Sequence, residues 1–221
     1  MKLYSENNGL IIDTSEHHTF NQGTYSRIYD YNEDTCFKVF KEANIYRPEP
    51  IIILKSLDLK NFYQIIDLLY DSNHVYSGYL MKLYQSIDKD ILSDKEYLVE
   101  SVNNIYDSIS CLTRNNILVS DLHRNNLILT SDGIIMLDCD DFTKSKLAET
   151  SQLNNFRFKS LLISLLFDCL VKKHNPKNLD MGIKLVQRLV EEDRFGLDHF
   201  NKTMRLYQKP IDYFNKAISR W

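Results

Sequence analysis

Little in this sequence divides it or charges it strongly. Its 221 residues include only 6 Gly and 4 Pro, and no stretch rich in Gly, Pro or Ser separates one part from another. We therefore expect one domain, or two small lobes that share a cleft. The net charge of −3 gives no global basic field of the kind that attracts nucleic acid. We expect no nucleic-acid partner.

Long hydrophobic runs are also missing. Residues 1–6 carry no apolar segment of the kind found in a secretory signal peptide. The longest apolar stretch, Leu161 to Leu170, is interrupted by Ser164 and Asp168 and is too short to cross a bilayer. The sequence therefore predicts a cytoplasmic protein with no membrane span.

Closely spaced cysteine pairs are missing as well. The four cysteines are Cys36, Cys111, Cys139 and Cys169, and each lies in an apolar context. This pattern favours buried free thiols in a reducing compartment over a disulfide framework. The remaining composition, 43% hydrophobic and 26% charged, is ordinary for a globular protein.

Three polar residues follow short apolar runs in the middle of the sequence. They are Asp121, Asn126 and Asp138, five and twelve residues apart. Phosphoryl transfer needs one carboxylate that orients a hydroxyl nucleophile, and further oxygen ligands that hold Mg²⁺ beside the phosphates. Carboxylate and amide oxygens suit this hard cation. The pattern therefore indicates a phosphoryl-transfer site.

The segments around these residues, 119–129 and 134–140, resemble the catalytic and metal-binding loops of the protein-kinase-like superfamily. The resemblance implies that Asp121 accepts or orients the proton of the attacking hydroxyl. It implies that Asn126 and Asp138 bind Mg²⁺ and that ATP is the phosphate donor. With the lysine described below, the implied catalytic residues are Asp121, Lys38 and Asn126.

Upstream, residues 20–29 resemble the glycine-rich loop that covers the phosphates in this superfamily. Gly23 takes the second glycine position, where the backbone must approach the phosphates closely. Other residues of the loop would form its tip or pack on the adenine. The implied nucleotide-binding residues here are Asn21, Gly23, Thr24, Tyr25, Ser26 and Ile28.

The range 35–40 is a predicted strand with one inward lysine, Lys38. It resembles the strand lysine that holds the α- and β-phosphates as a point charge. A second predicted strand, 75–84, resembles the one that leads into the adenine-binding hinge. There the implied contacts are Lys82 and Tyr84, with Met81 at the back of the pocket.

The resemblance implies an α+β, two-lobed protein-kinase-like fold. A small antiparallel β N-lobe would cover residues 1–84, and a reduced α-helical C-lobe would cover residues 85–221. Short β-prone runs in residues 1–40 agree with this, and Asn32–Thr35 predicts the turn of a hairpin. Pro48 and Pro50 are expected to break regular structure before a short helix over 51–59.

Helical periodicity follows residue 85. One apolar stripe recurs at spacings of 4, 3, 4 and 3 and predicts an amphipathic helix. Its members are Leu98, Val102, Ile105, Ile109 and Leu112. The range 158–170 is apolar on nearly every side, which predicts a buried helix, and 204–218 carries a final amphipathic stripe with Pro210 inside it.

Several positions depart from the superfamily pattern. The glutamate that should pair with Lys38 is not evident: Glu49 is the first candidate by position and Glu42 the second. Two interpretations of Asp140 stand, a second metal ligand and a helix cap, and capping is favoured. Only about twenty residues separate Asp138 from the predicted buried helix, so the usual peptide-docking segment is cut down.

These features predict an ATP- and Mg²⁺-dependent phosphotransferase that acts on a hydroxyl. A protein Ser/Thr acceptor is favoured over a small molecule, although the Asp-Leu-His sequence that ends at His123 resembles aminoglycoside and choline kinases. One alternative is a pseudokinase that binds a nucleotide or a partner without chemistry. Another is an interaction protein with an aromatic surface, since the chain has 14 Tyr and 11 Phe.

Overall fold

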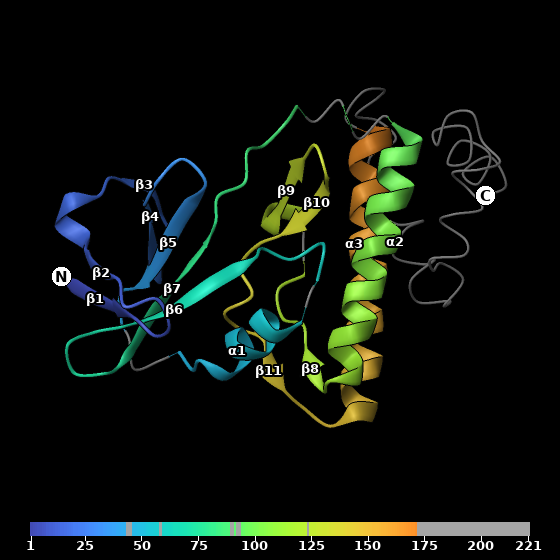
Figure 1. Ribbon diagram of the computed structural model, residues 1–221. Helices are drawn as coiled ribbons and strands as arrows, with labels where there is room; N and C mark the ends of the chain where they lie inside the picture. The colour runs from blue at the N-terminus through green and yellow to red at the C-terminus, as the bar shows by residue number, and fades with distance from the viewer. Residues whose placement is uncertain (43–45, 58, 89–90, 92–93, 123, 172–221) are drawn as a thin grey trace, which may run out of the picture.

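The computed structural model describes residues 1–42, 46–57, 59–88, 91, 94–122 and 124–171. In this part of the chain, seven strands form one curled antiparallel sheet in the order β2-β1-β6-β7-β5-β4-β3 (Figure 1). They are β1 (Lys2–Ser5), β2 (Ile11–Asp13), β3 (Thr19–Gln22), β4 (Ser26–Asp30), β5 (Thr35–Phe40), β6 (Ile65–Tyr70) and β7 (Tyr76–Lys82). With three α-helices and several short elements, the described residues make a mixed α+β fold.

The central strand β5 has the sequence Thr-Cys-Phe-Lys-Val-Phe, and five of its six residues are buried. β-Branched and aromatic residues of this kind fit a pleated surface that is covered on both faces. The turn before β5 is closed by Asn32, whose side chain accepts hydrogen bonds from the Asp34 N–H (3.0 Å) and the Thr35 hydroxyl (2.7 Å). The predicted hairpin at Asn32–Thr35 is therefore confirmed.

The two faces of the sheet pack against different cores. One face carries a small apolar cluster of seven residues: Leu3, Ile12, Tyr29, Phe37, Val39, Leu69 and Leu80. The other belongs to the main core, which includes residues of all three helices. Because side chains alternate along a strand, Lys38 lies on the opposite face from Phe37 and Val39, toward this main core.

A buried carboxylate on β6 binds the end of β1 and the turn that follows it. The Asp67 side chain, 0% exposed, accepts hydrogen bonds from the Ser5 hydroxyl (2.8 Å) and the Asn7 N–H (3.1 Å), and it pairs with Lys55 (3.1 Å). Burial acts to raise the pKa of Asp67, but the hydrogen bonds from Asn7, Ser5 and Lys55 outweigh it and lower the pKa to about 2.

The helix α1 spans Glu49–Ser56 and begins earlier than predicted. Pro48 is its N-cap residue and Pro50 lies in its first turn. The first turn of a helix has N–H groups without intrahelical partners, so proline is tolerated there. The two prolines therefore begin this helix, whereas the sequence predicted an interruption of regular structure.

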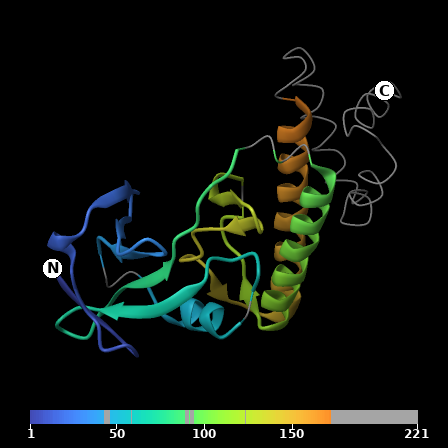
Figure 2. The same ribbon diagram turned by 45° about the horizontal axis from the view of Figure 1, so that its top comes forward.

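Two long helices lie side by side in both views (Figures 1 and 2). The helix α2 (Lys95–Arg114) is capped by the Asp94 side chain, and its predicted apolar stripe is buried, at 0–4% exposure. The helix α3 spans Leu147–Val171 and begins eleven residues before the predicted start at Phe158. The segment between Asp138 and this helix is therefore shorter than the sequence indicated.

Short elements fill the space between the sheet and the helix pair (Figure 2). They are β8 (Ile117–Leu118), η4 (Arg124–Asn126), β9 (Leu127–Thr130), β10 (Gly133–Met136) and β11 (Thr143–Lys144), whereas η1 (Thr14–Glu16) directly follows β2 at the N-terminal end of the sheet. β10 is joined to the segment before β6: the Met136 N–H donates to the Asn61 carbonyl (2.7 Å), and the Tyr63 N–H donates to the Met136 carbonyl (3.1 Å).

No helix in the described part of the chain combines the length and apolar composition that a membrane span needs. Of the predicted thiols, Cys36 and Cys139 are buried and Cys111 is half-buried, and all three are free. His123 and the predicted stripe over 204–218 lie outside the described residues.

Candidate functional site

Lys38 and Tyr79 form a cross-strand pair on β5 and β7 and project from the same face of the sheet. The neighbouring position on β7 is Gly78, where a Cβ atom would overlap the carbonyl oxygen of Lys38. The absence of a side chain at Gly78 therefore lets β7 lie close to the backbone of Lys38.

Two aspartates from the segment after β10 converge on Lys38. Its Nζ atom lies 2.6 Å from Asp138 Oδ1 and is also paired with Asp140 Oδ2. The Tyr79 hydroxyl donates to Asp140 Oδ1 (2.8 Å), and the Tyr63 hydroxyl donates to the Tyr79 oxygen (2.9 Å). A chain of polar contacts therefore runs from Tyr63 to Asp138 through Lys38.

Burial and charge act in opposite directions on the pKa values of this group. Burial acts to lower the pKa of Lys38, but the charges of Asp140 and Asp138 outweigh it and raise that pKa. For Asp140, burial raises the pKa to about 6, although Lys38 partly offsets it. At neutral pH the lysine is therefore protonated and the Asp140 carboxylate is mostly ionised.

Asp121 and Asp138 share an uncommon backbone conformation. Their φ angles are 55° and 60°, in the left-handed region that few residues other than glycine adopt, although aspartate does so more readily than most. Such conformations cost free energy and gather at functional sites. The Asn126 side chain donates to Asp121 Oδ2 (3.0 Å), and the Leu137 N–H donates to the Asn126 carbonyl (2.7 Å), so the two loops are joined.

Side chains of α3 hold the backbone just before the loop that carries Asp121. The Asn154 side chain accepts from the Val119 N–H (2.8 Å) and donates to the Ile117 carbonyl (2.9 Å), while the Arg157 guanidinium donates to the Val119 carbonyl. Both backbone groups of Val119 are therefore fixed two residues before Asp121. Asn154 and Arg157 could not be predicted from the sequence as site residues, because polar residues in a helix carry no signal for what they bind.

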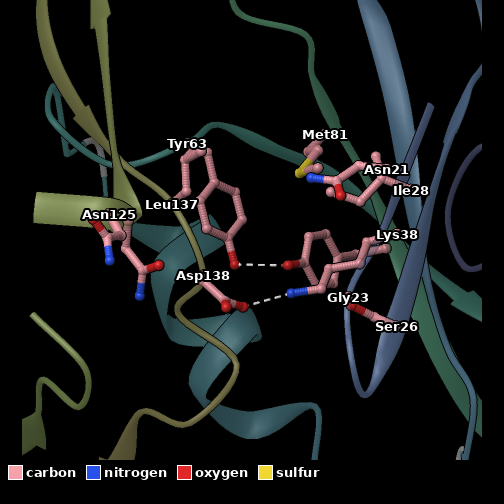
Figure 3. Close-up of a pocket in the computed structure, with 12 residues that line it drawn as sticks. Asn21, Gly23, Ser26, Ile28, Lys38, Tyr63, Met81, Asn125, Leu137 and Asp138 are labelled. Carbon is pink, nitrogen blue, oxygen red and sulfur yellow. Dashed lines mark hydrogen bonds and ion pairs between the residues drawn. The ribbon is translucent and has the colours of Figure 1, made fainter. Parts of the chain in front are cut away.

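A cavity of about 190 Å³ lies between the strands and these loops (Figure 3). Figure 3 shows Lys38 reaching across it toward Asp138. Seven of the residues proposed from the sequence line it: Asn21, Gly23, Ser26, Ile28, Lys38, Asn126 and Asp138. Met81, expected at the back of the pocket, also lines it.

Four further lining residues were not proposed from the sequence: Tyr63, Tyr79, Asn125 and Leu137. Tyr79 could have been found, because it lies two positions before Met81 on one strand and side chains two apart share a face. Tyr63 precedes β6, in a segment where no periodic pattern indicates an inward residue.

The turn between β3 and β4 closes one side of the cavity. The Gly23 N–H donates to the Ser26 carbonyl (3.0 Å), and Lys41 Nζ donates to the Gly23 carbonyl (2.8 Å). A Cβ atom at Gly23 would lie 3.8 Å from Ser26, which is an ordinary contact. The fold itself therefore does not require glycine at this position.

Some residues proposed for nucleotide binding lie outside the set of described residues that line the cavity. Thr24 and Tyr25 occupy the tip of the turn, and Tyr25 is 67% exposed. Lys82 lies at the end of β7, with its Nζ atom 5.3 Å from the centre of the Tyr84 ring, and the Tyr84 hydroxyl accepts from the Gln64 N–H (3.1 Å).

Asp121 also lies outside the cavity lining, next to the lining residue Asn126. Asp121 is exposed, so its loop presents this carboxylate at the surface beside the cavity.

The structure pairs Lys38 with neither predicted glutamate. Glu49 and Glu42 are both exposed, whereas the ion pairs of Lys38 are with Asp138 and Asp140. The capping interpretation of Asp140 is wrong, because Asp140 lies in a turn well before α3 begins at Leu147. The sequence could not show this, since the contact joins residues 102 positions apart.

The oxygen donors of Asn126 and Asp138 suit a cation that takes most of its ligands from water molecules and phosphate groups. Among the described residues, no group of three or more His, Cys, Asp or Glu side chains could hold a metal ion. Mg²⁺ is commonly bound through one or two carboxylates together with substrate phosphates and water. Asp138, with a side chain that is 51% exposed, and Asn126 fit that requirement.

No protein-family model matches this sequence, and no curated protein matches it either.

Proposed function

We propose that this chain is an ATP- and Mg²⁺-dependent phosphotransferase with a two-lobed, protein-kinase-like fold, and that it transfers the γ-phosphate to a hydroxyl. A protein Ser/Thr acceptor is favoured over a small molecule. The observation that carries the proposal is the convergence of Lys38, Asp138 and Asn126 on one cavity under the turn at Gly23.

Each residue has a role that its position supports. Lys38, protonated and buried, provides a fixed positive charge for the phosphates of ATP. Asn126 and Asp138 would hold Mg²⁺, which neutralises the charge of the phosphates when it is bound. Asp121, held by Asn126 at the surface beside the cavity, orients the acceptor hydroxyl and takes its proton.

The cavity is smaller than a complete nucleotide site. Ligand pockets usually measure roughly 300–1,000 Å³, compared with about 190 Å³ here. Lys38 is also engaged by Asp138 at 2.6 Å. Binding of ATP therefore requires that Asp138 turn from Lys38 toward the metal and that the cavity widen.

The decisive experiment incubates purified protein with γ-labelled ATP and Mg²⁺, alone, with casein, and with choline or an aminoglycoside. We expect wild type to label a protein acceptor and the Asp138→Asn variant to label none. Asp132→Asn is the matched control, because Asp132 is an exposed aspartate in the turn between β9 and β10. Equal labelling by wild type and Asp138→Asn would contradict the proposal, and label on the small molecule alone would assign the acceptor to that class.

A second candidate function is nucleotide binding without transfer. The observation that favours it is the double engagement of Lys38 by Asp138 and Asp140, which opposes the approach of phosphates. A thermal shift with ATP, with no transfer and no loss of γ-phosphate under any of the conditions above, would support this pseudokinase function instead.

A further inference from the structure

The two aspartates that pair with Lys38 differ in how firmly they are held. The side chain of Asp138 is 51% exposed, whereas that of Asp140 is 7% exposed. An exposed carboxylate can exchange Lys38 for water or a metal ion at low cost, because solvent compensates the lost contact. A buried carboxylate beside a buried lysine cannot do so, because a charge would be left without a partner.

The surroundings of Asp140 hold both of its oxygens. Lys38 Nζ pairs with Oδ2, and the Tyr79 hydroxyl donates to Oδ1 at 2.8 Å. Because Lys38 and Tyr79 are cross-strand partners, one rigid piece of sheet supplies both donors. The Tyr79 ring stacks on Tyr63, with centroids 5.5 Å apart and planes at 11°, and their hydroxyls are hydrogen-bonded.

The helix α1 takes no part in this arrangement. Glu49, in its first turn, is exposed, and so is Glu42. Near its C-terminal end, Lys55 pairs with Asp67 on β6 instead. Within the described residues, the carboxylates that face Lys38 therefore come from the segment after β10.

We propose that Asp140 is the positioning residue for Lys38: it stays paired with the lysine throughout the reaction, while Asp138 exchanges the lysine for the metal. This inference rests on the proposed function for its catalytic consequence. Asp140 would hold the lysine charge in place from the metal-binding segment itself, without a glutamate from α1. Its removal would force Asp138 to serve both Lys38 and Mg²⁺.

The test compares wild type with Asp140→Asn, Asp140→Glu and Tyr79→Phe, with Glu49→Gln and Glu42→Gln as matched carboxylate controls. In protein labelled with ¹⁵N-lysine and free of nucleotide, the Lys38 ammonium signal is assigned through Lys38→Arg. A paired, buried ammonium exchanges its protons slowly, so we expect a signal in wild type and in the two controls, Glu49→Gln and Glu42→Gln. We expect Asp140→Asn to lose or broaden it and Tyr79→Phe to weaken it.

The catalytic arm measures KM for ATP, the half-saturating Mg²⁺ concentration and kcat on the acceptor identified above. We expect Asp140→Asn to raise KM and the Mg²⁺ requirement about tenfold, the scale of one lost charge-assisted hydrogen bond. Asp140→Glu should bring KM and the Mg²⁺ requirement part of the way back to the wild-type values, because it keeps the negative charge. Unfolding curves identify any variant that fails to fold. If Asp140→Asn fails to fold, the Lys38 signal of Tyr79→Phe, which keeps every charge, decides whether Asp140 positions Lys38.

The results separate this inference from the proposed function. An unchanged Lys38 signal in Asp140→Asn, or an equal loss in Glu49→Gln, would overturn the role of Asp140. So would active Asp140→Asn protein with wild-type values of KM and Mg²⁺ requirement. If wild type transfers no phosphate but Asp140→Asn still loses the Lys38 signal, the proposed function fails while the pairing of Asp140 with Lys38 stands.

Discussion

Lys38 and Tyr79, opposite each other on β5 and β7, together hold the two oxygens of one carboxylate, Asp140. A charged donor and a neutral donor thus act on the same buried group. Burial alone would favour a neutral Asp140, and the lysine opposes that effect. The pair links the register of the sheet to the position of the segment that carries Asp138.

The first prediction concerns Gly78. The Gly78→Ala substitution should lower the free energy of unfolding by about 1–3 kcal/mol, because the added Cβ overlaps the Lys38 carbonyl and pushes β7 away from β5. Urea denaturation measures this change. Gly23→Ala is the matched control and should stay within about 0.5 kcal/mol of wild type, since its Cβ meets no close neighbour. Equal effects at both glycines would contradict the prediction.

The second prediction concerns Asn154 on α3. The Asn154→Ala substitution leaves the Val119 N–H and the Ile117 carbonyl without a buried partner, and it should cost about 2–3 kcal/mol of stability. The neighbouring Asn155 is exposed, so Asn155→Ala should change stability by less than about 0.5 kcal/mol. Thermal and chemical unfolding of the two variants would show the difference, and identical stabilities would refute the role assigned to Asn154.

The third prediction concerns Asp121. The Asp121→Asn substitution should reduce kcat by about 10²–10⁴-fold, because the acceptor hydroxyl loses its proton acceptor. The fold should be retained, since asparagine tolerates the left-handed conformation found at this position. ATP binding, measured by calorimetry, should be unchanged. Asp141→Asn, at a nearby exposed position, should keep wild-type turnover, and retained turnover in Asp121→Asn would reject the role of proton acceptor.

The fourth prediction concerns pH and Asp67. Its pKa falls from 3.8 to about 2 on folding, so its ionised form stabilises the fold at every pH above 3.8. That stabilisation, on the order of 2 kcal/mol, should be lost as the pH falls from 3.8 through about 2. Unfolding free energies measured between pH 6 and pH 2 should decline in this window more steeply for wild type than for Asp67→Asn. Parallel curves would contradict the assignment.

Sequence patterns located the elements whose signal is periodic or local. The stripe from Leu98 to Leu112 predicted α2, and the turn at Asn32–Thr35 predicted the β4–β5 hairpin, since neither depends on distant residues. The strand over 35–40 was also predicted to carry one inward lysine, and Lys38 is buried in β5. These predictions are confirmed by the structure.

The contacts of Lys38 could not be predicted in the same way. Asp140 and Tyr79 are 61 residues apart, and their hydrogen bond depends on how β7 and the segment after β10 come together. Residues that begin a helix, or that occupy one without an apolar repeat, were also misjudged. Pro48 and Pro50 begin α1, and the first turns of α3, with Thr150 and Asn154 buried, lack the apolar repeat that marks a helix.

The hydrogen bonds between Met136 and the segment at Asn61 and Tyr63 fix one side of the cavity. They join β10 to the approach to β6 immediately beside Tyr63, on the side of the cavity that carries Leu137 and Asp138. Movement there would break backbone pairing between sheet and loops at once. The opposite wall, the turn at Gly23, contacts the chain just after β5 through Lys41, whose N–H donates to the Tyr25 carbonyl (2.9 Å) and whose Nζ donates to the Gly23 carbonyl (2.8 Å). We therefore expect a ligand to enter the cavity past the Gly23 turn, while the side of the cavity at Met136 stays fixed.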